Sequence, residues 1–201
     1  MSKDDILKFF QILYGSKAPG YLTICNKKDF RTKWIEAANL EKVSEIANEQ
    51  AKDRDVYFGI GLRNIKLDER KRGTWQDILA LSGLWLDVDI YYKDAHINRD
   101  LPKDVEIALN VLDKFKLKPT FIIHTGHGLN PLYLTEELWI FKNENELLEA
   151  KNKSFSFNKA LINLFKENDY HLDNVGNIDR VIRVPYTTNF KANDPWTFPP
   201  P

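Results

Sequence analysis

The run Leu-Trp-Leu-Asp-Val-Asp-Ile at residues 84–90 constrains the fold of this 201-residue chain more than any other segment. Its apolar residues continue to Tyr92, and the composition predicts a strand over residues 84–92. Side chains on a strand alternate between faces, so Asp87 and Asp89 project together while the apolar residues beside them enter the core. Two carboxylates on one face repel each other unless a cation separates them, and such an oxygen pair suits Mg²⁺ or Mn²⁺. The alternative is an edge strand with two solvated aspartates, and the pair alone does not decide.

A glycine-bracketed turn forms the second informative segment, Thr125-Gly-His-Gly128, between two apolar runs. Backbone N–H groups and an imidazole in such a turn can converge on phosphate oxygens, so the segment predicts an anion-binding loop. The alternative is a hairpin in which Gly126 and Gly128 supply positive φ angles and the histidines are incidental.

The third segment, residues 171–191, carries Asp173, Arg180, Arg183 and Lys191. Planar guanidinium groups bind phosphates through paired hydrogen bonds, and a lysine adds a point charge. The segment therefore predicts a site for a triphosphate or for a template backbone. The alternative is ion pairing with the nearby aspartates Asp173, Asp179 and Asp194.

The pattern along the rest of the chain alternates helices and strands, which predicts an α/β or α+β sheet protein. Helices are expected at residues 4–14, 41–52, 103–115 and 144–167, and further strands at 21–25, 56–62, 119–124, 132–141 and 181–184. Residues 31–37 fit either a hairpin partner of the first strand or the start of a helix.

Bulk composition excludes some classes of protein. Lys plus Arg and Asp plus Glu both number 29, so nucleic-acid binding would need a local basic patch or a bound metal. The one cysteine, Cys25, can form neither an internal disulfide nor a multi-cysteine zinc site, which favours a reduced intracellular protein. No signal peptide or membrane span is visible, so we expect a soluble, cytoplasmic protein without a membrane partner.

Taken together and in this order, the three segments resemble the archaeo-eukaryotic primase superfamily, in particular the prim-pol enzymes of plasmids, phages and related mobile or defence systems. The first motif of that family is an Asp-x-Asp or Asp-x-Glu pair on a strand, and Asp87-Val-Asp89 matches it. The preceding Arg72-Gly-Thr-Trp75 and Gly83-Leu-Trp85 are also similar to many relatives.

The second family motif reads Ser-x-His or Ser-Gly-x-Gly-x-His and contacts the incoming nucleotide. His127, with Thr125 in the place of serine, satisfies the shorter form, whereas Asn130 occupies the last histidine position of the longer form. The resemblance therefore implies that His127 contacts the nucleotide phosphates, with Asn130 as a second candidate.

The third family motif is a hydrophobic residue followed by Asp, and then Arg-x-x-Arg with Pro, Thr, Asn and Lys. Leu172-Asp173 followed by residues 180–191 fits this pattern. The resemblance implies that Asp173 is the third metal ligand; Asp179 is the alternative because it also follows a hydrophobic residue.

The resemblance covers roughly residues 20 to 191 and implies an α+β fold, with an RRM-like antiparallel sheet, flanking helices and an N-terminal α/β unit. It implies a catalytic domain over residues 1–192, made of two interleaved lobes. Residues 193–201 read as an extended, proline-rich linker or tail that leads to further domains.

The implied activity is that of a template-dependent DNA primase and polymerase, a nucleotidyltransferase of DNA replication that makes primers de novo and extends them from (d)NTPs. Two Mg²⁺ or Mn²⁺ ions would be held by Asp87, Asp89 and Asp173. The expected partners are a single-stranded DNA template and a primer strand, bound by a monomeric core with additional replication partners. The expected nucleotide contacts are Thr125, His127, Asn130, Arg180, Arg183 and Lys191, and further candidates for template contact are Arg63, Lys71 and Arg72. The alternative function is a non-catalytic single-stranded nucleic-acid-binding or replication-initiator module.

Overall fold

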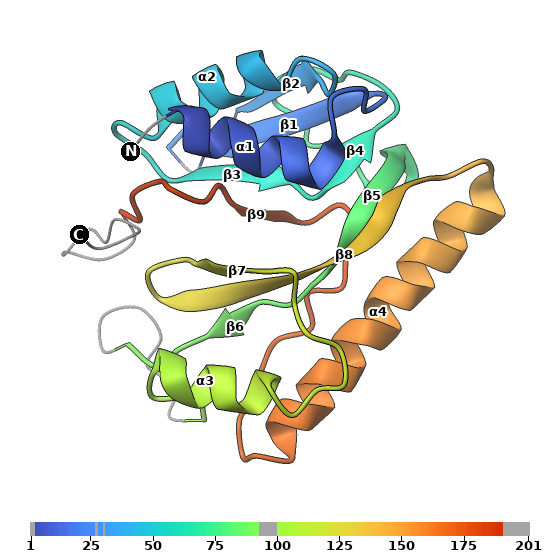
Figure 1. The fold of residues 1–201 in the computed structure, drawn as a ribbon. Coiled ribbons are helices and arrows are strands. Elements are labelled where there is room, and N and C mark those ends of the chain that lie inside the picture. Colours follow the sequence, from blue (N-terminus) through green and yellow to red (C-terminus); the bar gives the residue numbers. More distant parts are fainter. Residues whose placement is uncertain (1–2, 27, 30, 93–99, 191–201) are drawn as a thin grey trace.

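The computed structural model describes residues 3–26, 28–29, 31–92 and 100–190. Within these ranges one nine-stranded sheet carries four α-helices and a short 3₁₀ helix (Figure 1). The N-terminal half contains α1 (Lys3–Tyr14), β1 (Tyr21–Asn26), β2 (Thr32–Glu36), α2 (Leu40–Gln50), β3 (Val56–Gly59) and β4 (Gly61–Arg63). The remainder contains η1 (Trp75–Asp77), β5 (Ile78–Trp85), β6 (Val88–Asp89), α3 (Val105–Leu112), β7 (Phe121–His124), β8 (Gly128–Ile140), α4 (Glu144–Lys166) and β9 (Val181–Arg183).

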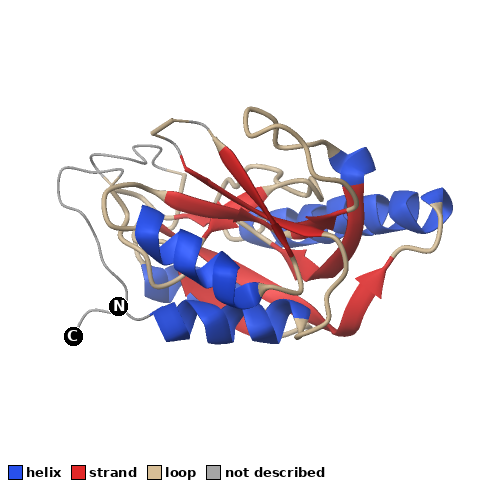
Figure 2. Ribbon diagram, turned by 90° about the horizontal axis from the view of Figure 1, so that it is seen from above, coloured by secondary structure: helices blue, strands red, loops and turns tan. Residues whose placement is uncertain are grey.

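The sheet follows the order β6-β8-β5-β4-β1-β3-β9, with β2 paired to β1 and β7 paired to β8. Every strand pairing within the described residues is antiparallel. The expectation of an α+β fold with an antiparallel sheet and flanking helices is confirmed, and residues 32–36 are the hairpin partner of β1. In the perpendicular view of Figure 2 the helices lie around the outside of the strands.

Two hydrophobic clusters divide the core between the halves of the molecule. The first joins α1 and α2 to β1, β3 and β4, and Phe10 and Phe58 meet edge-to-face in it with ring centroids 5.2 Å apart. The second joins α3 and α4 to β6 and β8, and it includes Val88, Leu129 and Phe165. Figure 1 shows β9, from the C-terminal end of the described chain, running beside β3.

The predicted strand at 84–92 begins earlier than expected and is interrupted between β5 and β6. Its register on β8 is unbroken, because Trp85 pairs with Leu132 and Val88 pairs with Leu129. At the intervening position Leu86 N–H donates to the carbonyl of Pro131 over 3.2 Å, but proline has no N–H to donate in return. The local sequence of β8 therefore explains the interruption.

The helices are positioned by conventional caps. Asp104 and Asn143 accept hydrogen bonds from the N–H groups of Ile107 and Glu146 and so begin α3 and α4. Among the residues that the structure describes, no helix is both long enough and apolar enough to cross a membrane.

Candidate functional site

A cavity of about 670 Å³ lies where β1, β3, β6, the β7–β8 turn and β9 meet. Its volume is within the range of about 300–1,000 Å³ that is common for small-molecule sites. Residues from all three predicted motifs line it: Asp87, Asp89, Thr125, His127, Asn130, Arg180 and Arg183. A second cavity, of about 750 Å³, lies against α4, but its two charged side chains, Glu149 and Lys153, pair with each other over 2.7 Å. The first cavity is therefore the candidate site.

Asp87 is held in a fixed orientation by the neighbouring strand. The register of β6 on β8 places it opposite Asn130, whose Nδ2 donates to Asp87 Oδ1 over 2.9 Å. The same amide also donates to the carbonyl of Leu86 over 3.3 Å, which is the acceptor that Pro131 cannot satisfy. Asn130 is buried. Its side-chain amide replaces the missing N–H of Pro131 in the hydrogen-bond ladder between the strands, and it also orients the carboxylate of Asp87.

The carboxylate pair projects from one face of its strand, as the alternation predicts. Val88 is fully buried between Asp87 and Asp89, while both aspartates are half-buried and line the cavity. Arg180 Nη2 approaches Asp87 Oδ2 to 3.6 Å, and both side chains remain partly open to solvent. An ion pair of this exposure contributes little to stability, so its significance lies in the position of the charges.

Of the two candidates for the third carboxylate, Asp179 lines the cavity, and the assignment of Asp173 or Asp179 as the third metal ligand stays a prediction. Asp173 is exposed and does not line the cavity; two residues before it, His171 N–H bonds to the carbonyl of Asp100. Asp179 lies instead in a tight turn before β9, closed by a 2.9 Å bond from Arg180 N–H to the carbonyl of Asn177.

The glycine turn is the connection of the β7–β8 hairpin. Gly126 has a φ of +93°, whereas Gly128 is required for close packing, since a Cβ there would lie 2.5 Å from the carbonyl oxygen of Val88. The expected positive φ angle is therefore confirmed for Gly126, whereas Gly128 does not have a positive φ angle. The hairpin still brings Thr125 and His127 to the cavity.

His127 is buried beside the carboxylate strand. Its carbonyl accepts a 3.1 Å bond from Ile90 N–H, and its ring lies against Tyr92 with a centroid separation of 4.5 Å. The Thr125 hydroxyl donates to the carbonyl of Gly128 over 3.1 Å, so it helps to close the turn. Both residues are therefore part of the cavity wall and have defined positions.

Arg183 lines the cavity from β9, but its guanidinium is already engaged. Nη1 forms a 2.8 Å ion pair with Asp55 Oδ1, and Nη2 donates to the Tyr57 hydroxyl over 3.1 Å. Burial raises the pKa of Tyr57 to about 12, so its hydroxyl stays protonated at neutral pH. The predicted ion pairing of Arg183 does exist, with Asp55 rather than with Asp173 or Asp179.

The basic cluster after β4 divides into a buried and an exposed part. Arg63 is fully buried and donates to the carbonyls of Gly61, Arg72 and Asp179, so its expected role in template contact is contradicted. Arg63 is buried because β4 lies inside the sheet, between β1 and β5. This burial lowers the pKa of Arg63. Arg72 is exposed and lines the cavity, whereas Lys71 does not line it. Lys191 and the tail at 193–201 lie outside the described residues.

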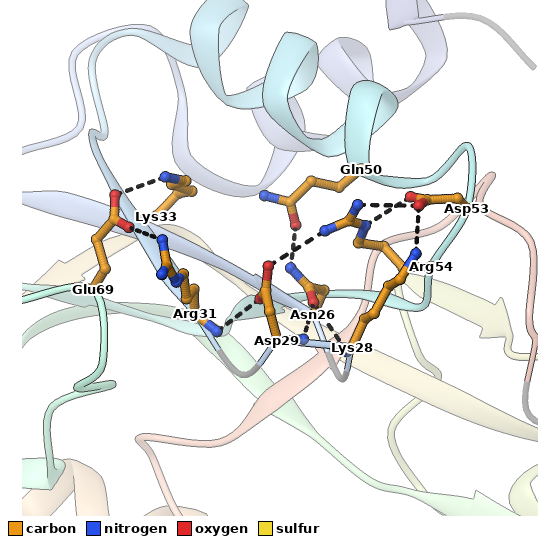
Figure 3. A network of polar contacts seen from close by, with 9 residues as sticks. All are labelled: Asn26, Lys28, Asp29, Arg31, Lys33, Gln50, Asp53, Arg54 and Glu69. Atoms are coloured by element: carbon orange, nitrogen blue, oxygen red, sulfur yellow. Dashed lines mark hydrogen bonds and ion pairs between the residues drawn. The ribbon is translucent and has the colours of Figure 1, made fainter.

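Several lining residues were not among the predicted site residues: Cys25, Asn26, Tyr57, Arg70, Asn177 and Asn189. Arg70 has a signal in the sequence, since it belongs to the basic cluster of residues 66–72. Asn26 has none, because its position depends on a 3.1 Å bond from its Nδ2 to Gln50 Oε1, within the network of polar contacts drawn in Figure 3. These residues are brought to the cavity by pairing between strands that are distant in sequence.

The donor set at the cavity suits a hard divalent cation. Asp87 and Asp89 provide carboxylate oxygens on one face, and Asp179 adds a third carboxylate to the same cavity. Mg²⁺ is usually bound through one or two carboxylates together with waters and substrate phosphates. Among the described residues, no group of three or more Asp, Glu, His or Cys side chains is arranged to hold a metal ion by itself.

Comparison with known proteins gives one informative structural match. No protein-family model matches the sequence, and no curated protein matches it. The structure is similar to the AEP domain of the primase-polymerase (PrimPol) of cyanophage S-2L, with a TM-score of 0.58 and 12% sequence identity. The match covers 96% of this chain and 86% of that domain. The chain therefore has the fold of a primase-polymerase AEP domain.

Proposed function

We propose that this protein is a template-dependent primase-polymerase that joins nucleotides by two-metal-ion nucleotidyl transfer. One observation carries the proposal: Asp87 and Asp89, the glycine hairpin and Arg180 all line one cavity. The similarity to a primase-polymerase AEP domain supports the reaction class. The meeting of three separate segments at one cavity supports the choice of residues.

Asp87 and Asp89 would hold the divalent cations, with Asp179 as the third carboxylate. When bound, such ions lower the pKa of an attacking hydroxyl and stabilise the charge of the departing pyrophosphate. Asn130 would orient Asp87 for this role, because its Nδ2 donates a 2.9 Å hydrogen bond to one carboxylate oxygen.

The cationic side chains would orient the triphosphate for in-line attack. Arg180 is half-exposed and reaches the cavity from the turn before β9, so its guanidinium is available to a ligand phosphate. Arg70 and Arg72 approach from the loop after β4 and are exposed. This role is one of position and electrostatics and does not involve covalent chemistry. His127 contributes the imidazole of the hairpin wall.

The same cations make the entrance of the cavity suitable for a single-stranded template. The overall charge of the chain is balanced, so template binding would depend on this local cluster of Arg70 and Arg72. The substrates of the reaction are then a DNA template, a primer end and (d)NTPs.

The test is incorporation of each of the four labelled nucleotides on homopolymeric single-stranded templates, with Mg²⁺ or Mn²⁺. We expect products that contain only the nucleotide complementary to the template. A non-catalytic binding module would retain the template in a salt-dependent manner without any product. Product that ignores the template, or no product with either metal, would rule the proposal out.

A further inference from the structure

Residues 184–190, here called the strap, follow β9 and run back toward the glycine hairpin. Val184 N–H bonds to the carbonyl of Val56 over 3.0 Å, and the Thr187 hydroxyl donates to the carbonyl of Val184 over 2.7 Å. Between them Tyr186 has a φ of +61°, which is uncommon for a residue other than glycine. The strap therefore has a specific conformation that other contacts must maintain.

Asp55, just before β3, contacts Arg183, the residue before the strap, and Phe190, its last residue. Its Oδ1 accepts a 2.8 Å bond from Arg183 Nη1 and a 3.0 Å bond from Phe190 N–H. Arg183 Nη1 also donates to the carbonyl of Thr188 over 3.1 Å. The Arg183 and Asp55 side chains are only 6% and 13% exposed, so this ion pair is largely shielded from solvent.

The strap in turn holds the glycine hairpin. Asn189 is buried, lines the cavity, and donates through Nδ2 to the carbonyl of Thr125 at the start of the turn. The other groups of Thr125, its N–H and its hydroxyl, bond to the carbonyl of Gly128. A continuous series of contacts thus joins Asp55 to the hairpin that carries His127, although Asp55 does not line the cavity.

We infer that Asp55 is a positioning residue for the nucleotide site, acting through Arg183 and the strap on the Thr125–Gly128 turn. This inference rests on the proposed function for its effect on catalysis, but its structural part is independent of it. Loss of the Asp55 charge leaves the Arg183 guanidinium buried without its carboxylate, which favours movement of the strap. The hairpin then loses the contact that fixes the Thr125 carbonyl.

The experiment compares the Asp55→Asn and Asp55→Glu variants with wild type, using Asp53→Asn as the matched control. Asp53 lies two residues away and pairs on the surface with Lys28 and Arg54. Amide hydrogen exchange is measured on a peptide covering the β7–β8 turn. We expect faster exchange there in Asp55→Asn, with smaller changes in α2 and α4, and no change in Asp53→Asn.

The kinetic readout is nucleotide KM against kcat in primer extension. We expect Asp55→Asn to raise KM about tenfold, equivalent to about 1.4 kcal/mol, with kcat changed much less, because ground-state binding is what the displaced hairpin loses. Asp55→Glu keeps the charge and should restore most of the affinity.

Unchanged exchange at the turn in Asp55→Asn would overturn the inference, as would an equal increase throughout the molecule, which indicates a general stability effect. If the wild-type protein makes no product, the proposed activity fails, and the exchange comparison still decides whether Asp55 positions the hairpin.

Discussion

Arg180 Nη2 lies 3.6 Å from Asp87 Oδ2, so the guanidinium stands beside the carboxylate that we propose as a metal ligand. The other oxygen of Asp87 is already bonded to Asn130. A cation that binds Asp87 must compete with Arg180, and a phosphate that arrives with the cation offers Arg180 a new partner. If the proposed ligands bind here, this geometry would couple metal binding to nucleotide binding at one side chain.

This coupling predicts opposite effects of Arg180→Ala on two ligands. Removal of a half-exposed pair worth about 0–1 kcal/mol should tighten Mn²⁺ binding to the nucleotide-free protein by up to about fivefold. Nucleotide KM should rise about tenfold, since a phosphate contact is lost. Titration calorimetry with Mn²⁺ and steady-state incorporation measure the two effects. Weaker binding of Mn²⁺ would contradict the competition.

The two aspartates of the third segment provide a matched comparison. Asp179→Asn should lower kcat/KM about 100-fold, because it removes a carboxylate from the cavity. Asp173→Asn should stay within about twofold of wild type, as expected for an exposed side chain outside the cavity. Single-turnover incorporation measures both variants. The reverse ranking would return the role of third ligand to Asp173.

The loop after β4 should determine how template affinity depends on salt. Substituting both Arg70 and Arg72 with alanine should reduce the slope of log K against log salt by about 1.4, if each neutralises one phosphate of a single strand. Lys71→Ala, between them in sequence but outside the cavity lining, should have a smaller effect. Fluorescence anisotropy of a labelled oligonucleotide at several salt concentrations measures the slopes, and equal slopes in all three proteins would contradict this assignment.

His124, at the end of β7, should make folding stability depend on pH. Burial lowers the pKa of His124, with a further contribution from His127, and its Nδ1 accepts a bond from Gly126 N–H. Because the folded-state pKa is below the unfolded value of about 6.5, the unfolded chain binds the proton first as pH falls. The contribution of His124 to stability is therefore complete above about pH 6.5 and is lost below it.

The variant His124→Asn keeps an acceptor for Gly126 but does not titrate in this range. Its free energy of unfolding should fall less than that of wild type between pH 7.5 and pH 5.5, as measured by urea denaturation. Parallel losses in the two proteins would show that His124 has no such role.

Local patterns in the sequence were sufficient to predict the carboxylate pair. The alternation around Val88 places Asp87 and Asp89 on one face whatever the strand pairs with, and the glycines indicate a turn regardless of its neighbours. The antiparallel architecture followed from the resemblance of three ordered motifs rather than from periodicity.

The remaining site residues depend on pairing between distant strands. Asp179 reaches the cavity because β9 pairs with β3, and Arg63 is buried because β4 is internal to the sheet. Neither fact is visible in the spacing of residues along the chain, and a charged residue such as Arg63 is ordinarily expected at the surface. The Asn130 contact likewise requires the register of β6 on β8.

We propose that the Asp87–Asp89 cavity forms phosphodiester bonds. The direct measurement is template-dependent nucleotide incorporation by the double variant Asp87→Asn with Asp89→Asn, beside wild type and Asp173→Asn. We predict that the double variant loses activity roughly 1,000-fold or more while it still binds single-stranded template. Incorporation by the double variant at the wild-type rate would contradict the claim.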